Sequence, residues 1–277
     1  GDLSLLEIPR SLKEKLAAKG ITSLRTILDS FEVIVEAFKV PAEVAADLAT
    51  QVARVLAGLD QELPPLSPEF KISTLSSELD ALLQGGFSTG ALHEIVGLSG
   101  SGKTATCLNM LISVQCPRSC RGLEASCLYI DTDGSFSSQR YVQLLSLHCE
   151  ESHRVKAAED YLQGVSYTRP TSEYQFLHLM DHLEELLKPD TRLIVIDDIS
   201  TLLKPMQSKD NLARSKYLVR LGLKLQQLAA DRNLAVVVTN KLTQADEVTQ
   251  PRLGESWTSV LTTRLWLRES GAYLATC

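Results

Sequence analysis

A glycine-rich segment carries the clearest chemical signal in the sequence. Residues 97–104 read Gly-Leu-Ser-Gly-Ser-Gly-Lys-Thr, which matches the pattern G-x-x-x-x-G-K-[ST] in full. Glycines let successive backbone amides close around a phosphate, and a helix that begins here adds the positive end of its dipole. Lys103 is then placed to reach the β- and γ-phosphates of a nucleotide, and Thr104 to ligate Mg²⁺. The residues expected around the phosphates are Gly97, Leu98, Ser99, Gly100, Ser101, Gly102, Lys103, Thr104 and Ala105.

A buried acidic residue is expected to complete the magnesium site. The continuous apolar run 193–196 ends in Asp197, which is followed by Asp198. An apolar strand that ends in a carboxylate, downstream of such a glycine-rich segment, is the arrangement that positions Mg²⁺ in P-loop proteins. We therefore expect Asp197 and Thr104 to hold the metal, with Asp198 as a neighbour.

A second acidic strand end offers a catalytic carboxylate. The apolar run 127–130 leads into Asp131-Thr-Asp-Gly. Asp133 is placed to orient or deprotonate an attacking water. The alternative is that an Asp before Gly134 only caps the loop. Lys103 and Asp133 are the candidate catalytic residues.

A third strand end supplies a candidate nucleotide contact. The apolar run 235–239 leads into Asn240 and Lys241. Polar residues at the carboxyl ends of parallel strands commonly face a bound ligand. We expect this end to sense the γ-phosphate, with Lys241 among the nucleotide-binding residues.

Basic residues are concentrated after Asp197. Between residues 204 and 224 the sequence has six basic residues against one acidic residue, a net charge of +5 in a chain of net charge −6. Lys209, Arg214 and Lys216 are the candidate DNA contacts. The alternatives are a solvated helix face or an interface with an acidic partner.

Alternating helices and short apolar strands must position these residues. Candidate strands at 93–96, 127–130, 193–196, 235–239 and 265–267 are continuous apolar runs, typical of strands buried on both faces of a parallel sheet. The fold class is therefore α/β, a P-loop core with a mostly parallel sheet flanked by helices, over residues 75–277. Residues 61–74 contain three prolines in positions 64–68 and predict an extended linker.

Residues 1–60 predict a small, all-helical domain. The segment around Gly20 is similar to the turn of a helix-hairpin-helix unit, which can hold DNA phosphates through backbone amides. A protein-docking bundle is favoured instead, because seven basic against nine acidic residues leave this domain at net −2.

Composition narrows the class of protein. The 277 residues are 44% hydrophobic and 22% charged, as in ordinary globular proteins. We expect no membrane span and no signal peptide. Six scattered cysteines favour reduced thiols in a cytosolic or nuclear compartment over a disulfide framework.

These pieces together resemble the RecA-type recombinases, in particular the eukaryotic recombinase paralogues. The resemblance runs from Ser73 to the C-terminus and is carried by STLSSELDALLQGGFSTGALHEIVG, the glycine-rich segment, LYIDTDGSF, LIVIDD, AVVVTN and GESWTSVLTTRLWL. With the helical domain and linker it covers nearly the whole chain. The EIVG, AVVVTN and GESW…TRLWL details are most similar to the D-type paralogue.

The resemblance implies a RecA-like ATPase core that uses ATP and Mg²⁺ in homologous recombination repair, in the nucleus. It implies that Arg140, in GSFSSQR, packs on adenine. Expected partners are other recombinase paralogues, namely the C-type paralogue and the second X-ray-repair cross-complementing protein. Single-stranded or branched DNA is expected within the complex, and no membrane.

The sequence departs from the active recombinases at three places. Asp133 replaces their catalytic Glu, and its shorter side chain would leave the carboxylate roughly 1.5 Å further from the water. Lys241 replaces their γ-phosphate-sensing Gln. The segment that corresponds to their second DNA loop, about 242–253, is shorter in this chain and carries Asp246 and Glu247. We therefore predict a slow, DNA-dependent ATPase within a heteromeric paralogue complex. The alternatives are an autonomous strand-exchange recombinase that forms its own filament, and a non-catalytic module that holds nucleotide.

Overall fold

The structure, a computed structural model, divides into two compact units, residues 1–66 and 67–277. It describes residues 3, 6, 8–56, 69–149, 158–203, 211–245, 248–268 and 271–276. Each unit has its own hydrophobic core. Among the described helices, none combines the length and the apolar character that a membrane crossing needs.

The first unit consists of helices in its described part. These are α1 (Arg10–Ala18), α2 (Leu24–Asp29), α3 (Phe31–Ala37) and α4 (Ala42–Leu56). Their apolar faces share one core, in which Leu16, Ile27 and Leu48 are completely buried. The chain turns after α1 at Gly20, whose φ of 73° is a left-handed conformation that glycine adopts without strain.

The second unit is built on an eight-stranded sheet with the strand order β10-β9-β3-β7-β6-β4-β5 and β8 beside β7. Its strands are β3 (Ala91–Gly97), β4 (Ser126–Asp131), β5 (Val165–Thr168), β6 (Thr191–Asp197), β7 (Ala235–Ala245), β8 (Val248–Pro251), β9 (Thr263–Arg268) and β10 (Gly271–Thr276). Every pair from β9 to β5 is parallel, whereas β10 and β8 are antiparallel to their neighbours. The prediction of a mostly parallel sheet flanked by helices is confirmed.

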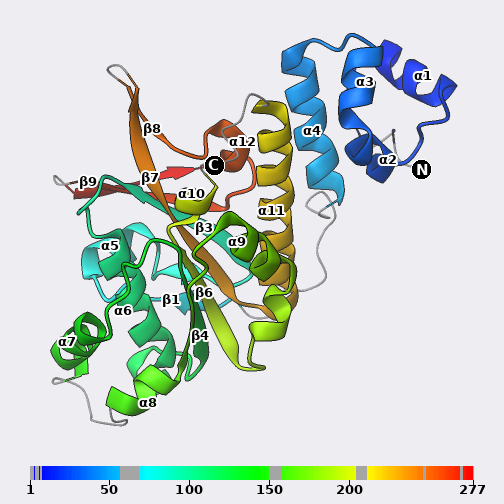
Figure 1. Cartoon of the computed structure of the whole chain (residues 1–277). Coiled ribbons are helices and arrows are strands. Elements are labelled where there is room, and N and C mark those ends of the chain that lie inside the picture. The colour runs from blue at the N-terminus through cyan, green and yellow to red at the C-terminus, as the bar shows by residue number, and fades with distance from the viewer. Residues whose placement is uncertain are drawn as a thin grey trace. The chain divides into compact units, whose positions relative to one another are not determined.

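Helices cover both faces of this sheet (Figure 1). One face packs against α5 (Ser77–Leu82), α6 (Lys103–Gln115), α7 (Ser138–Cys149) and α8 (Ala158–Gln163). The other packs against α9 (Glu173–Asp181), α10 (Ile199–Leu202), α11 (Asn211–Arg232) and α12 (Glu255–Thr258). Neighbouring strand residues alternate between the two cores, as a period of two requires: Val195 joins the first and Ile196 the second. Both faces of the sheet are buried under helices, so its strands are expected to be continuous apolar runs without polar alternation.

The second unit begins earlier than the predicted linker allows. β1 (Lys71–Ile72) lies within the range 61–74 that was expected to be linker, and it pairs with β2 (Phe87–Ser88). The Thr74 backbone N–H and hydroxyl both donate to Asp80, at 2.8 and 2.7 Å, which ties this segment to α5. Residues 61–68 lie outside the described residues.

A candidate nucleotide-binding site

The glycine-rich segment connects β3 to α6 and leaves no room for a larger residue at its start. A Cβ on Gly97 would fall within contact distance of the Ser101 hydroxyl and 2.7 Å from the Leu267 carbonyl oxygen. Gly100 and Gly102 have φ values of 82° and 97°, in the region that favours glycine. The motif therefore forms the tight turn that the sequence predicts, and its glycines are structurally required.

Lys103 lies across this turn. Its Nζ donates to the carbonyl oxygens of Gly97, at 2.9 Å, and Leu98, at 2.7 Å. Burial lowers the pKa of Lys103, and the nearby charge of Lys241 adds to this effect, whereas Asp198 and Asp197 oppose it. The ammonium is thus held directly beside the loop that would surround a phosphate.

Asp197 ends β6 and accepts hydrogen bonds on both carboxylate oxygens. Thr104 Oγ1 donates to Oδ2 at 2.7 Å, so the predicted metal-binding pair is in direct contact. Tyr129 OH and Ser135 Oγ also donate to Oδ2, at 2.7 and 3.1 Å, and Thr239 Oγ1 donates to Oδ1. Asp197 is buried, and these donors fix the direction in which its oxygens point.

Sequence reasoning missed Tyr129, Ser135 and Thr239 as members of this site. Tyr129 and Thr239 lie on β4 and β7, which flank β6 on its two sides. Tyr129 lies two residues before the end of β4, and Thr239 directly precedes the polar pair Asn240 and Lys241 on β7. Polar side chains at these positions, on the two neighbours of the acidic strand, are the signal that could have identified both, whereas Ser135 lies in a loop. Burial together with the charge of Asp197 raises the pKa of Tyr129 far above its usual range, so its hydroxyl is a donor.

Asp131, rather than Asp133, caps the loop after β4. Its Oδ1 accepts from the backbone N–H of Gly134 and Ser135, at 2.8 and 3.0 Å, and its Oδ2 accepts from Tyr167 OH at 3.1 Å. The loop-capping role considered for Asp133 thus falls to its neighbour two residues earlier. Asp133 is left with its carboxylate directed elsewhere.

Asp133 forms an ion pair with Lys241. Lys241 Nζ lies 2.6 Å from Asp133 Oδ2 and 3.4 Å from Asp198 Oδ2. Burial acts to lower the pKa of Lys241, but its hydrogen bond to Asp133 and the charge of Asp198 outweigh that effect, and the pKa is raised. Two of the three departures from the active recombinases, Asp133 and Lys241, are therefore in contact with each other.

Asp198 caps α10 and is the chain neighbour of Asp197, the expected metal ligand. Its Oδ1 accepts from Ser200 N at 2.6 Å and from Ser200 Oγ at 2.7 Å. Burial raises the pKa of Asp198.

The remaining candidates are on other helices or outside the described residues. Arg140 is exposed on α7, where its Nη1 donates to Gln143 Oε1 at 3.5 Å. Arg214, near the start of α11, donates to the carbonyl oxygen of Arg252 at 2.8 Å. Lys216 follows on the same helix, and Lys209 lies outside the described residues.

These residues fit a magnesium nucleotide. The turn gives a phosphate access to backbone amides, and the first N–H groups of α6, from Lys103 to Ala105, precede the first hydrogen bond within the helix, Thr106 N to Gly102 O. The Thr104 hydroxyl and the Asp197 carboxylate are oxygen ligands of the kind Mg²⁺ prefers. When bound, Mg-ATP supplies a terminal phosphate that can be transferred to water.

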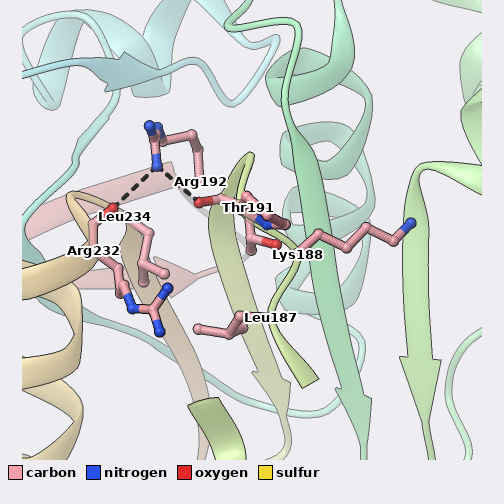
Figure 2. Close-up of a pocket in the computed structure, with 7 residues that line it drawn as sticks. Leu187, Lys188, Thr191, Arg192, Arg232 and Leu234 are labelled. Carbon is pink, nitrogen blue, oxygen red and sulfur yellow. Dashed lines mark hydrogen bonds between the residues drawn. The ribbon is translucent and has the colours of Figure 1, made fainter. Parts of the chain in front are cut away.

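A separate hollow lies where β6 begins, at the opposite end of the strand from Asp197 (Figure 2). It is lined by Leu187, Lys188, Pro189, Thr191, Arg192, Arg232 and Leu234. Thr191 begins β6 whereas Asp197 ends it, so roughly 20 Å of strand separates the two places. The Arg192 Nη1 already donates to the carbonyl oxygens of Thr191 and Arg232, at 3.2 and 3.0 Å. This hollow is not part of the nucleotide-binding site.

The parallel sheet, the glycine-rich turn and the Thr104–Asp197 contact define a P-loop nucleotide-binding protein. The family model Rad51 matches residues 67–268. The chain belongs to the Rad51 family, and its second unit is a RecA-like α/β core.

Individual relatives agree with this assignment. The chain is 32% identical over 216 residues to DNA repair protein RAD51 homolog 3 of Dictyostelium discoideum, covering 71% of this chain and 56% of that protein. It is 32% identical over 208 residues to DNA repair protein RAD51 homolog 4 of Bos taurus, covering 71% and 60%. DNA repair and recombination protein RadA of Aeropyrum pernix is 31% identical over 181 residues, covering 64% and 55%. The chain thus spans well under two thirds of the length of these relatives.

Proposed function

We propose that this chain is a recombinase paralogue that binds Mg-ATP and acts in homologous recombination repair within a heteromeric paralogue complex in the nucleus. The observation that carries the proposal is the 2.7 Å hydrogen bond from Thr104 to Asp197, which joins the two halves of a magnesium–nucleotide site. The names of the relatives, which place them in DNA repair and recombination, support the biological role.

Different residues of the site bind the phosphates, the metal and the adenine of the nucleotide. The amides of the turn and of the first turn of α6 bind the phosphates, and Lys103 adds a positive charge beside them. Thr104 and Asp197 hold the metal, and Tyr129, Ser135 and Thr239 keep the Asp197 carboxylate in place. Arg140 packs on the adenine, as the resemblance implies.

Hydrolysis is expected to be slow. A general base must have a free carboxylate within reach of the attacking water. The carboxylate of Asp133 is instead engaged by Lys241 at 2.6 Å. The same observation favours the second candidate function, a module in which nucleotide holds the fold in a binding-competent state without turnover.

The finer assignments are also proposals. Within the family we propose the D-type paralogue, on the motifs GESW…TRLWL and AVVVTN, with the C-type paralogue and the second X-ray-repair cross-complementing protein as partners. We propose that DNA is contacted by Lys209, Arg214 and Lys216, within the complex. Arg214 and Lys216 lie near the start of α11, the helix that carries the second part of the basic segment.

The test combines nucleotide binding with solution mass. Fluorescent ATP binding should require Mg²⁺ and should be lost in Lys103→Ala, while Lys71→Gln, at an exposed pair with Glu69, should bind as the wild type does. Light scattering should give a monomer with and without Mg-ATP and single-stranded DNA. A DNA-dependent increase to filament-sized particles would instead identify an autonomous recombinase.

The outcome for Lys103→Ala separates the two remaining readings. Loss of both nucleotide and partner binding supports an ATP-governed assembly. Intact nucleotide and partner binding in Lys103→Ala would contradict the proposal.

A further inference from the structure

Lys241 lies between two carboxylates that differ in burial and in the number of their hydrogen bonds. Asp198 is 1% exposed and its Oδ1 is engaged by Ser200, which fixes it at the start of α10. Asp133 follows the end of β4 in a loop, with its side chain 23% exposed. In the described part of the chain, the Asp133 carboxylate has no hydrogen bond besides the one from Lys241.

The ammonium of Lys241 is the charge that makes the buried Asp198 tolerable. Asp198 Oδ2 is buried without a hydrogen-bond partner among the described residues, and Lys241 Nζ lies 3.4 Å from it. A buried carboxylate that lost this ion-pair partner would be left, among the described residues, with the charge of Lys103 alone, at a large cost. Lys241 therefore has a reason to remain beside Asp198 whatever happens to Asp133.

Lys241 also lies next to the phosphate-binding turn. It is the register partner of Gly97 in the parallel β3–β7 pair, and the Gly97 carbonyl accepts from Lys103. Lys103 and Lys241 are close enough for each to affect the other's charge. The site thus has two cations, Lys103 bonded to the turn and Lys241 paired with a partly exposed carboxylate.

We propose that Asp133 serves as an exchangeable counter-ion for Lys241. The terminal phosphate of ATP displaces Asp133 from Lys241, so that the pair sets the preference of the site for ATP over ADP. The inference rests on the proposed function, because it needs nucleotide in this turn. A phosphate carries more negative charge than one carboxylate and competes for the ammonium, whereas Asp198 cannot leave. Asp133 then opposes ATP binding rather than activating water.

The two partners are expected to act in opposite directions, and this sign difference is the test. Binding of ADP and of a non-hydrolysable fluorescent ATP analogue is measured with Mg²⁺ on the full chain. Lys241→Gln should lower the ratio of ATP to ADP affinity by about tenfold, the loss of one charge-assisted hydrogen bond. Asp133→Asn should raise that ratio by several-fold, because Lys241 no longer has a competing carboxylate.

Two further variants control for charge and folding. Lys241→Arg keeps the cation and should retain the preference for ATP to within about threefold. Lys71→Gln removes a lysine from an exposed ion pair and should leave the ratio unchanged. Lys241→Gln also removes the ion-pair partner of Asp198, so its unfolding curve is measured as well. If Lys241→Gln is unfolded, the result for Asp133→Asn decides the test.

An unchanged or lowered ATP-to-ADP ratio in Asp133→Asn would overturn the inference, and so would an unchanged ratio in a folded Lys241→Gln. In both cases the wild type still binds Mg-ATP, so the proposed function stands. A wild-type chain that binds no nucleotide would remove the proposed function and this inference together.

Discussion

Asp197 accepts hydrogen bonds from hydroxyl groups on separate segments of the chain, and each of them helps to fix its carboxylate. Thr104 comes from α6, Tyr129 from β4, Ser135 from the following loop and Thr239 from β7. A charged acceptor strengthens each of these hydrogen bonds. The position of the carboxylate is therefore a property of the whole strand end and not of Asp197 alone.

Tyr129→Phe tests this arrangement with a minimal change of shape. Removing the hydroxyl that lies 2.7 Å from Asp197 should lower the free energy of unfolding by about 1–2 kcal/mol. It should also weaken Mg-dependent nucleotide binding. Urea unfolding measures the first effect and nucleotide titration the second. The matched control is Tyr273→Phe, an exposed tyrosine whose hydroxyl accepts from Arg268 at 2.9 Å, with an expected change below about 0.5 kcal/mol. Equal effects in the two variants would contradict a special role for Tyr129.

His93 gives the second unit a pH dependence. Its Nε2 lies 2.8 Å from the Ser88 carbonyl oxygen, which can only accept, so Nε2 carries the proton of a neutral ring. Burial lowers the pKa of His93 from 6.5 to about 4. The unfolded chain thus binds a proton at a higher pH than the folded chain does. The stability is complete above the unfolded pKa and falls as the pH drops from about 6.5 towards 4.

Between pH 7 and pH 5 this residue should cost about 2 kcal/mol of unfolding free energy. Urea unfolding at the two pH values, in the wild type and in His93→Gln, isolates its part from that of the carboxyl groups. The variant should lose less stability on acidification. An equal loss in both proteins would rule His93 out as a source of the pH dependence.

At the scale of elements, a buried ion pair joins the strands that lead into the site. Glu94 on β3 accepts from Arg264 on β9 and, at 2.8 Å, from Asn240 Nδ2 on β7. Arg264 also donates to Thr258 Oγ1 on α12 at 3.0 Å. Glu94 and Arg264 are register partners, so the pair sets the alignment of β3 and β9. This alignment places Gly97 beside Leu267, where no side chain larger than glycine fits.

Arg264→Met should destabilise the second unit by about 3 kcal/mol or more, because it leaves Glu94 buried without its partner charge. Glu94→Gln together with Arg264→Met should cost less than the sum of the single changes. A double-mutant cycle from urea unfolding gives the coupling energy. Additive effects would mean that the two side chains do not stabilise each other.

At the scale of the whole molecule, the separate cores of the two units predict independent folding. The core of the first unit and the two cores on either side of the sheet share no residues. A fragment of residues 67–277 should unfold cooperatively and bind Mg-ATP as the full chain does. Circular dichroism and nucleotide titration check this. A fragment without a cooperative transition would show that the second unit depends on residues 1–66.

The continuous apolar runs predicted five strands, and the sheet contains all of them. β5 was missed because Val165-Ser-Tyr-Thr mixes polar and apolar residues, as an edge strand with a partly exposed face can. β1 was assigned to the linker, since a strand of two residues has no periodicity to detect. The short strands β2 and β8 were missed as well. In strands this short, tertiary pairing decides and local pattern does not.

The sequence by itself determined the local features of this protein: the glycine-rich turn, the helix that follows it and the apolar strand that ends in Asp197. Each depends on residues close together in the chain, where glycine conformation and hydrophobic pattern act directly. Only the tertiary structure decided which side chains meet at the strand ends. The Lys241–Asp133 pair joins residues 108 positions apart, and the Thr104–Asp197 contact joins residues 93 apart. Such contacts follow from strand order and register, because parallel pairing brings the carboxyl ends of distant strands to one edge of the sheet.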